Sequence, residues 1–493
     1  MAALRGRQTC IKILDKHLNS DNERSVGAAL ILGFKDEIPQ EVLTAYINTG
    51  SMHVLSVSGL HVGVVAIMLE LLLKKISTRR RWWRVTKPIV LIFFIWVFSI
   101  FTGASAAVLR AAVMFSFLIL GRSLRREVNI YNILAISAFV LLCYNPFLLM
   151  DVGFQLSYMA LVGIVYFQPK IYRMWLIDNK LGDYLWSLTA TGIAATLATL
   201  PISLYFFHQF PTYFWLSGFV VVPAAVVILW LGIALFCFDW IPFVGIIIGK
   251  LLYYGIWITN ALLFLIQKLP YSVVTGIFIS MAALIFLYLA LLSTSLAILT
   301  KRFRWVLVGL GCLVPVLGMR AYQAFRSVES KKIIIYNTYK NSIIDCISSG
   351  SCRSFQSSGL LPKTELFATQ NARWEAGVSN GSIEKFIFTD SLIERNDLLY
   401  KNNFISFCDK KIYFLNAPLI ADSSRKINID YLVVSKNSML QIKEIKKYFD
   451  ASLVILDASN TAYKAKKLAA ECQLIGQPCW DMSEQPAFVT YCK

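Results

Sequence analysis

Long runs of apolar residues, separated by short breaks of glycine, proline or charge, fill roughly the first two thirds of the chain. A helix that crosses the hydrocarbon core of a bilayer needs ~20 mostly apolar residues. The runs predict ten membrane-spanning helices, at residues 54–73, 88–104, 105–121, 130–147, 152–168, 185–207, 213–236, 245–267, 274–298 and 303–319. Only Thr102 to Ser105 divide the second from the third, so an alternative for 88–121 is a re-entrant or kinked pair.

The pattern changes after about residue 320. Short apolar runs then alternate with helix-forming stretches, which is typical of an α/β domain; the predicted strands are 332–336, 411–415, 430–434 and 452–456. The predicted fold class is therefore a polytopic α-helical membrane protein of about ten spans with a C-terminal soluble α/β domain. Its parts are an extracytoplasmic or interfacial segment at 1–53, a transmembrane module at 54–320 and the soluble domain at 321–493.

Composition and charge agree with this division. Hydrophobic residues make up 57% of the chain, above the ~45–50% of an ordinary globular domain. The net charge of +19 does not by itself indicate nucleic acid, because cytoplasmic loops of membrane proteins are rich in Lys and Arg. The segment Lys74 to Lys87 holds seven basic and no acidic residues, which predicts that it is cytoplasmic. Both termini then come out extracytoplasmic, and the protein is expected in a bacterial cytoplasmic membrane.

The first 53 residues lack the apolar core of a secretory signal, since Met1 to Lys16 is interrupted by five charges. A short helix is predicted at Glu37 to Asn48, with Pro39 in its first turn. An outer segment without a leader is awkward to translocate. We therefore expect that the natural gene product, or its relatives, begin further upstream.

Cysteines are concentrated in the C-terminal domain, which holds six of the ten: Cys346, Cys352, Cys408, Cys472, Cys479 and Cys492. An oxidising compartment would allow disulfides, and six cysteines have about fifteen connectivities. Buried free thiols fit the sequence equally well.

Polar residues inside the predicted spans are the candidate functional groups, because ionisable side chains are costly in a bilayer. The first span opens with His53, Ser56, Ser58, Gly59 and His61. The others are Arg110, which keeps its charge and needs an anion, carbonyls or water, and the pair Asp151 and Gln155. The predicted orientation places all of these in the outer half of the membrane, where they would form a polar vestibule.

Two structural interpretations compete with this functional one. The Ser and Gly residues of the first span are also typical of a helix-packing stripe, with the histidines hydrogen-bonded to neighbouring helices. Arg110 and Asp151 would also make a structural ion pair. A metal site is disfavoured, because His53 and His61 stand eight residues apart with no Cys or acidic residue beside them.

At these residues the sequence resembles the ComEC family, the polytopic channel of bacterial natural competence. The resemblance rests on three motifs in order, H-x-L-x-x-S-G-L-H-V at His53 to Val62, G-x-x-x-x-x-x-R-A at Gly103 to Ala111 and G-F-Q-L-S at Gly153 to Ser157. It implies passage of single-stranded DNA into the cytoplasm during transformation. Family members commonly carry further spans and an extracytoplasmic OB-like domain ahead of this module, and neither precedes it here.

The tail resembles the metallo-β-lactamase-like domain of many relatives, with its metal ligands replaced. Residues 430–441 match the strand and metal loop, but Lys436, Ser438, Leu440 and Gln441 stand where His, His, Asp and His are expected. No histidine follows His208, which argues against a His-based metal centre in the tail. We therefore expect a catalytically silent domain, no cofactor and no enzyme activity.

Together these observations predict a channel for single-stranded DNA. The path would involve His53, Ser56, Ser58, Gly59, His61, Arg110, Asp151 and Gln155. No Walker-type motif is present, so a separate cytoplasmic helicase or ATPase is expected as a partner, together with membrane lipid and an outer DNA receptor. The alternatives are a membrane lipid-phosphate transporter or enzyme, with His53 or His61 as general base, and an inactive paralogue.

Overall fold

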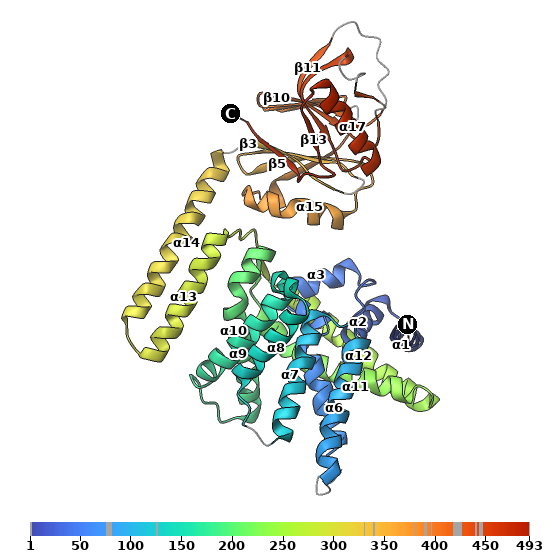
Figure 1. Cartoon of the computed structure of the whole chain (residues 1–493), viewed down its shortest axis with the longest axis vertical. Helices are drawn as coiled ribbons and strands as arrows, with labels where there is room; N and C mark the ends of the chain where they lie inside the picture. The colour runs from blue at the N-terminus through green and yellow to red at the C-terminus, as the bar shows by residue number, and fades with distance from the viewer. Residues whose placement is uncertain are drawn as a thin grey trace. The chain divides into compact units, whose positions relative to one another are not determined.

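The computed structural model of the chain consists of two compact units, Met1–Ile277 and Phe278–Lys493 (Figure 1). It describes residues 2–74, 81–124, 127–329, 331–338, 341–378, 380–388, 392–395, 397–417, 426–438, 441–442 and 447–492. Residues 75–80 of the predicted cytoplasmic loop at Lys74 to Lys87, as well as Arg125, Arg126 and Leu440, therefore lie outside the described residues.

The first unit is helical. Its helices are α1 (Ala2–His17), α2 (Asp21–Leu32), α3 (Gln40–Asn48), α4 (Met52–Leu55), α5 (Gly59–Leu72), α6 (Arg81–Phe101), α7 (Ala106–Ser123), α8 (Ile130–Tyr144), α9 (Val152–Tyr172), α10 (Lys180–Phe207), α11 (Phe214–Phe238) and α12 (Pro242–Gln267), with a 3₁₀ turn η1 (Pro146–Met150). Two short strands, β1 (Gln209–Pro211) and β2 (Val273–Thr275), pair antiparallel.

The prediction of a polytopic membrane protein is confirmed. Among the described residues, six helices are long and apolar enough to cross a membrane, namely α7, α10, α11, α12 and the two helices that open the second unit, α13 (Met281–Thr300) and α14 (Arg304–Glu329). Shorter apolar helices occupy Gly59–Leu72, Val85–Phe101 and Ile130–Tyr144. The predicted span at 274–298 begins wrongly, because β2 pairs with β1 there and the helix starts only at Met281.

The predicted first span, 54–73, is not one continuous helix. α4 ends at Leu55, Ser56 is extended (φ −96°, ψ 124°), and α5 begins at Gly59. The break between the second and third spans is also real, since α6 ends at Phe101 and α7 starts at Ala106, with Gly103 and Ala104 at positive φ. Both interruptions contain serine and glycine. The serine hydroxyl competes for backbone hydrogen bonds of the helix, and glycine readily adopts non-helical backbone angles because it has no side chain.

Helix α2 lies inside the core of the first unit, although its sequence is charged at one end. Its apolar half packs against α11 and α12, with Gly27 close to Ile256, and Ile31 close to Gly232. Glu23 is buried as well, and accepts a hydrogen bond from Asn260 Nδ2 (3.3 Å). Tyr46 Oη donates in turn to Asn260 Oδ1 (3.0 Å), so a buried polar network joins α2, α3 and α12.

The second unit continues from α13 and α14 into two β-sheets. The first, in the order β14-β3-β4-β5-β6, holds β3 (Lys331–Ile335), β4 (Ile343–Ser348), β5 (Ser351–Gln356), β6 (Ile383–Ile387) and β14 (Phe488–Tyr491). The second, in the order β13-β12-β11-β10-β9-β8-β7, holds β7 (Ile393–Arg395), β8 (Leu398–Lys401), β9 (Phe404–Phe407), β10 (Lys410–Leu415), β11 (Ile427–Val434), β12 (Phe449–Leu456) and β13 (Cys479–Asp481).

Three apolar clusters show how these sheets are layered. One cluster, which includes Ile333, Phe355 and Val433, lies between the two sheets. A second lies under α17 (Ala462–Ile475) on the larger sheet, and a third lies under α15 (Pro362–Glu375) on the smaller sheet. The domain is thus a helix–sheet–sheet–helix stack, and the predicted strands near 332–336, 411–415, 430–434 and 452–456 are confirmed as β3, β10, β11 and β12.

A buried ion-pair cluster holds α15 to the smaller sheet. Arg373 binds Asp345 through two hydrogen bonds (Nε to Oδ2, 2.7 Å; Nη2 to Oδ1, 3.0 Å) and Glu365 through a third (3.1 Å). The Arg373 and Glu365 side chains are 5% and 6% exposed, and that of Asp345 is fully buried. The guanidinium therefore neutralises two carboxylates that have no access to water.

We expect Arg373→Ala to lower the free energy of unfolding of this domain by about 3–5 kcal/mol, because it leaves the fully buried Asp345 carboxylate without a cationic partner, whereas Glu365 keeps its ion pair with Lys385 (2.7 Å). Urea denaturation of the detergent-purified full chain, followed by hydrogen exchange of domain peptides, measures the change. Arg395→Ala, at an exposed position on β7, is the control and should change the midpoint little. A loss below ~1 kcal/mol in Arg373→Ala would contradict this account.

Candidate functional site

The break between α4 and α5 is held by a serine and a histidine. The backbone N–H of Ser58 donates to His61 Nδ1 (3.2 Å), and Ser58 Oγ lies 3.1 Å from the same nitrogen. Because a backbone N–H can only donate, Nδ1 is an acceptor, and the proton of the neutral imidazole is on Nε2. His61 is 1% exposed, and its buried Nε2 has no hydrogen-bond partner among the described residues.

Arg110 lies on α7 beside this break. It is 5% exposed, and its guanidinium carbon lies 5.4 Å from the centre of the Tyr158 ring on α9. Its Nε and Nη1 atoms are buried and have no hydrogen-bond partner within the part of the chain that the structure describes. The same part contains no carboxylate within 4.0 Å of the guanidinium, so the alternative of an Arg110–Asp151 ion pair is wrong.

Gly59 makes room for the arginine. A Cβ atom on Gly59 would lie 3.3 Å from Arg110 Nη2 and 3.5 Å from the Ala111 side chain. One turn later, a Cβ atom on Gly63 would lie 3.1 Å from the Phe115 ring. The pair forms a G-x-x-x-G stripe that lets α5 approach α7 closely, so the predicted packing role of the small residues is compatible with a functional role of Arg110.

The remaining sequence-predicted residues have local partners. His53 is on α4, where its Nδ1 lies 3.0 Å from the Gly50 carbonyl oxygen, and Ser56 caps the C-terminus of that helix. Asp151 caps α9 by accepting from the Phe154 N–H (2.7 Å), and Gln155 Nε2 donates to the Leu149 carbonyl (2.9 Å). These contacts shape the η1–α9 junction and do not join Asp151 or Gln155 to Arg110.

Tyr158 is the site residue that sequence reasoning missed. It follows the G-F-Q-L-S motif directly, its ring faces Arg110, and its hydroxyl lies 2.9 Å from Ser137 Oγ on α8. The signal was its spacing, since Tyr158 lies one helical turn after Phe154, whose ring it contacts at 4.5 Å. The chemical arrangement is a buried cation over an aromatic face, on a helix that packs against the helix carrying the His61 N–H donor. Such a set of donors suits an anion.

In the C-terminal domain, hydrogen bonds occupy the position predicted for the metal loop. The turn after β11 is tied to the turn after β12, with the Lys436 N–H donating to Ser459 Oγ (2.7 Å) and the Asn437 N–H to Asn460 Oδ1 (2.9 Å). Ser438 Oγ donates to the Leu415 carbonyl (2.8 Å). No group of three His, Cys, Asp or Glu side chains among the described residues is placed to hold a metal ion, so the residues present do not fit such a centre.

Asp457 lies at the centre of these turns. It is 2% exposed and accepts hydrogen bonds from Ser342 Oγ and from the Ser459 N–H (3.0 Å). Burial raises the pKa of Asp457 to about 6, and the hydrogen bonds from Ser342 and Ser459 limit the rise. The carboxylate therefore stabilises the packing of turns rather than a metal.

The apolar helices and the C-terminal β-rich domain define a multi-pass membrane protein. The chain belongs to the Competence protein family, which matches residues 30–301, more than half of its length. Residues 333–491 match the ComEC C-terminal domain. The ComEC resemblance seen in the sequence motifs is thereby confirmed.

Two curated proteins illustrate the similarity. ComE operon protein 3 of Bacillus subtilis is 34% identical over 182 residues, which cover 37% of this chain and 22% of that protein. An uncharacterized protein of Aquifex aeolicus is 43% identical over 65 residues, 13% of this chain and 14% of that protein. The matches thus span about a fifth or less of the length of these relatives. No solved structure matches the chain.

The raised pKa of Asp457 predicts a pH dependence of domain stability. The folded state binds a proton at Asp457 more tightly than the unfolded state does, so the stability contributed by this carboxyl should be fully present below pH ~4 and be lost, by about 3 kcal/mol, as the pH rises through about 6. Asp457→Asn should abolish this fall in stability with rising pH. Asp450→Asn, at an exposed position on β12, is the control and should retain it. Urea midpoints from pH 4 to 8, read by exchange pulses at one fixed pH, provide the measurement. A wild-type profile that is flat over this range would refute the assignment.

Proposed function

We propose that this chain is the channel module for uptake of single-stranded DNA across the cytoplasmic membrane in natural transformation. Membership of the Competence protein family supports the process. The observation that carries the site is Arg110, a buried cation with no carboxylate partner among the described residues and two unpartnered nitrogens. A buried charge of this kind is expensive, and an anionic ligand that passes the site would offset the cost.

The path proposed for the strand runs past the α4–α5 break. Arg110 offers charge-assisted donors to each phosphate, and His61 offers the N–H on Nε2. The first turn of α5 at Gly59 adds unsatisfied backbone N–H groups, which favour an anion. An arginine locked in an ion pair would hold one partner permanently, whereas an open guanidinium can exchange one phosphate for the next. His53, Ser56, Asp151 and Gln155 stay in this proposal as residues that line or shape the entrance.

The same geometry weighs against His61 as the general base of the rival enzyme, but not against His53, whose Nδ1–H donates to the Gly50 carbonyl and leaves Nε2 unprotonated. A general base needs an unprotonated nitrogen facing its substrate, but the acceptor nitrogen of His61 is already occupied by Ser58. We therefore favour a binding and conducting role, with no enzyme activity in the chain, over a lipid-phosphate enzyme. The driving force would come from a separate cytoplasmic helicase or ATPase, and an outer DNA receptor would deliver the strand.

We propose a multi-pass location in the cytoplasmic membrane with the C-terminal domain on the extracytoplasmic side. The loop charges support this orientation. One contact bears on the N-terminal segment: Asp239, in the turn between α11 and α12, binds Lys16 (3.0 Å) and His17 (2.7 Å). The end of α1 and this turn therefore lie on the same side of the membrane. If residues 237–244 are cytoplasmic, as the loop charges predict, the end of α1 is cytoplasmic too, and residues 1–53 cannot all be extracytoplasmic.

Arg110→Ala should reduce internalisation of labelled DNA by ~10-fold or more, since it removes charged hydrogen bonds worth about 1.5–3 kcal/mol. Arg110→Lys should restore part of the uptake, because it keeps the charge without the fork of donors. Arg122→Ala, at the exposed end of the same helix, is the matched control. Transformation frequency and protease-protected DNA are the readouts, at equal membrane levels of each protein.

His61→Gln separates the structural role of the histidine from its functional role. Glutamine at this position can still accept from the Ser58 N–H, as in a capping box, so the variant should fold while uptake falls. His61→Ala should lose both the cap and the donor. Normal uptake in Arg110→Ala and in His61→Gln would sink the channel assignment, and altered lipid composition in these variants would favour the lipid-phosphate alternative. If uptake stayed normal in all variants and also after deletion of the gene, the chain would be an inactive paralogue.

Orientation is tested with two exposed cysteines near helix ends, Cys143 on α8 and Cys237 on α11. Each is retained alone in a background of Ser substitutions. A membrane-impermeant maleimide added to intact cells should label Cys143 and leave Cys237 unlabelled until the cells are opened. Labelling of Cys237 in intact cells would place the α11–α12 turn, together with the end of α1, on the outer side.

A further inference from the structure

Four of the six cysteines in the C-terminal domain form two pairs of neighbouring thiols. The thiol of Cys492 is hydrogen-bonded to that of Cys408. Both side chains pack against the apolar cluster between the two sheets. Their backbones are fixed independently, since the Cys492 N–H donates to the Lys331 carbonyl (2.9 Å) and the Cys408 N–H to the Asp397 carbonyl (3.1 Å).

The position of Cys408 is unusual for a cysteine. It occupies the two-residue turn between β9 and β10, where Phe407 pairs with Lys410, and it has a φ of 55°. Turns of this kind favour Asn, Asp or Gly, because other side chains are strained at positive φ. Its partner Cys492 follows β14, the edge strand of the other sheet. A bond between them would tie the larger sheet to the smaller one and fix the C-terminal strand.

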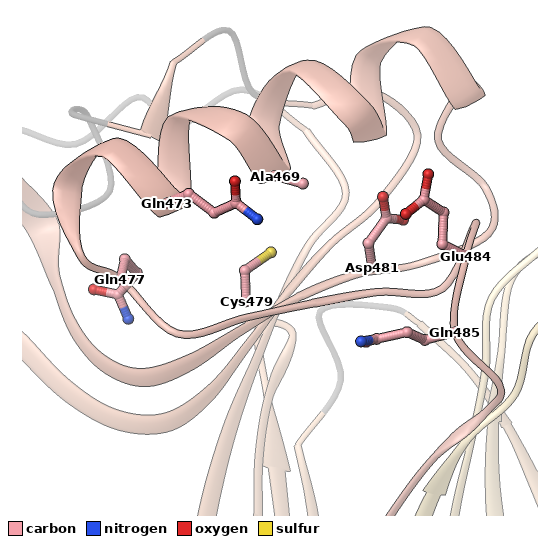
Figure 2. Close-up of a pocket in the computed structure, with 7 residues that line it drawn as sticks. All are labelled: Ala469, Gln473, Gln477, Cys479, Asp481, Glu484 and Gln485. Carbon is pink, nitrogen blue, oxygen red and sulfur yellow. The ribbon is translucent and has the colours of Figure 1, made fainter.

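The second pair joins a helix to a strand. The thiol of Cys479, the first residue of β13, is hydrogen-bonded to Cys472 on α17. Figure 2 shows the Cys479 thiol pointing toward α17, near Gln473 and Ala469. The Gln477 N–H donates to the Cys472 carbonyl (2.9 Å), which closes the short connection between the two cysteines. This pair would hold α17 against the outermost strand of the larger sheet.

The other two cysteines of the domain cannot pair with each other. Cys346 on β4 lies opposite Arg353, while Cys352 on β5 lies opposite Ile347. Residues one step apart on paired strands point to opposite faces of a sheet. Cys346 accordingly contributes to the cluster between the sheets, and Cys352 to the cluster under α15. The fold thereby excludes a bond between Cys346 and Cys352.

We propose that Cys408–Cys492 and Cys472–Cys479 are disulfides in the mature protein, with Cys346 and Cys352 left as thiols. The proposal rests on the extracytoplasmic placement of the domain given above. In each pair, two thiols lose two electrons and two protons to the disulfide of a thiol–disulfide oxidoreductase. One thiolate attacks the carrier disulfide, and the second cysteine displaces the carrier as a dithiol.

Burial bears on when the bonds form. It raises the pKa of Cys492 to about 12, with the neighbouring Cys408 adding to the rise, and it raises the pKa of Cys408 as well. The hydrogen bond with Cys472, followed by burial, raises the pKa of Cys479. Since the thiolate is the reactive species, exchange on the folded domain is slow at neutral pH. The bonds therefore form while the domain folds, before the thiols are buried.

The test uses the full chain in intact cells. Cells are quenched with acid, and free thiols are then blocked with N-ethylmaleimide in denaturant at neutral pH. The protein is reduced, and each released thiol is tagged with a polyethylene glycol maleimide that retards the protein on a gel by one step. Wild type should show about four steps, two for each disulfide. Cys408→Ser, Cys492→Ser and Cys472→Ser should each lose two steps. Cys346→Ser and Cys143→Ser should lose none.

Three results would overturn the pairing. These are no retardation in the wild type, an unchanged ladder in both Cys408→Ser and Cys492→Ser, or a loss of two steps in Cys346→Ser, which would pair Cys346 with Cys492 instead. Failure here is distinct from failure of the channel. Full retardation together with normal DNA uptake in the Arg110 and His61 variants would support the disulfides and contradict the channel. Lost uptake in these variants with no retardation of the wild type would support the channel and contradict the disulfides.

Discussion

A bilayer offers no water to an interrupted helix, and the rest of the membrane site depends on how this chain meets that constraint. The interruption at Ser56–Ser58 exposes backbone groups at the end of α4 and the start of α5. One side chain, His61, reaches back to accept from the Ser58 N–H. This cap fixes the tautomer of the ring, leaves its Nε2–H as a donor and places Gly59 at the first turn of α5, where the contact with α7 begins.

Arg110 follows from the same arrangement. A Cβ atom at position 59 would lie only 3.3 Å from Arg110 Nη2, so Gly59 eases the approach of the guanidinium, and the Tyr158 ring gives its flat face a favourable surface without neutralising its charge. The module therefore contains a buried cation, two of whose nitrogens have no hydrogen-bond partner among the described residues. A structural arginine elsewhere in the chain shows the contrast, because Arg373 is satisfied by two carboxylates and serves to hold a helix to a sheet.

In the C-terminal domain, buried polar groups hold helices, strands and turns together. Where the resemblance implies a metal, Asp457 and its hydroxyl and amide donors knit together the turns after β11 and β12. The two thiol pairs lie at other joints of the stack, between the sheets and between α17 and the edge strand. These interactions describe a domain whose fold is stabilised by polar contacts between apolar clusters.

The sequence by itself determined the membrane character, the approximate positions of most apolar helices and the strands of the domain that carry unbroken apolar runs, because hydropathy and period are local properties. It also singled out His61 and Arg110, since polar residues stand out against lipid-facing neighbours. It did not reveal the burial of α2, whose charged end looks soluble, nor strands such as β4 and β5, whose serine, aspartate and cysteine residues hide them. Only the tertiary structure decided which polar groups find partners, because hydrogen bonds, ion pairs and thiol contacts join residues far apart in the chain, and no local pattern encodes those distances.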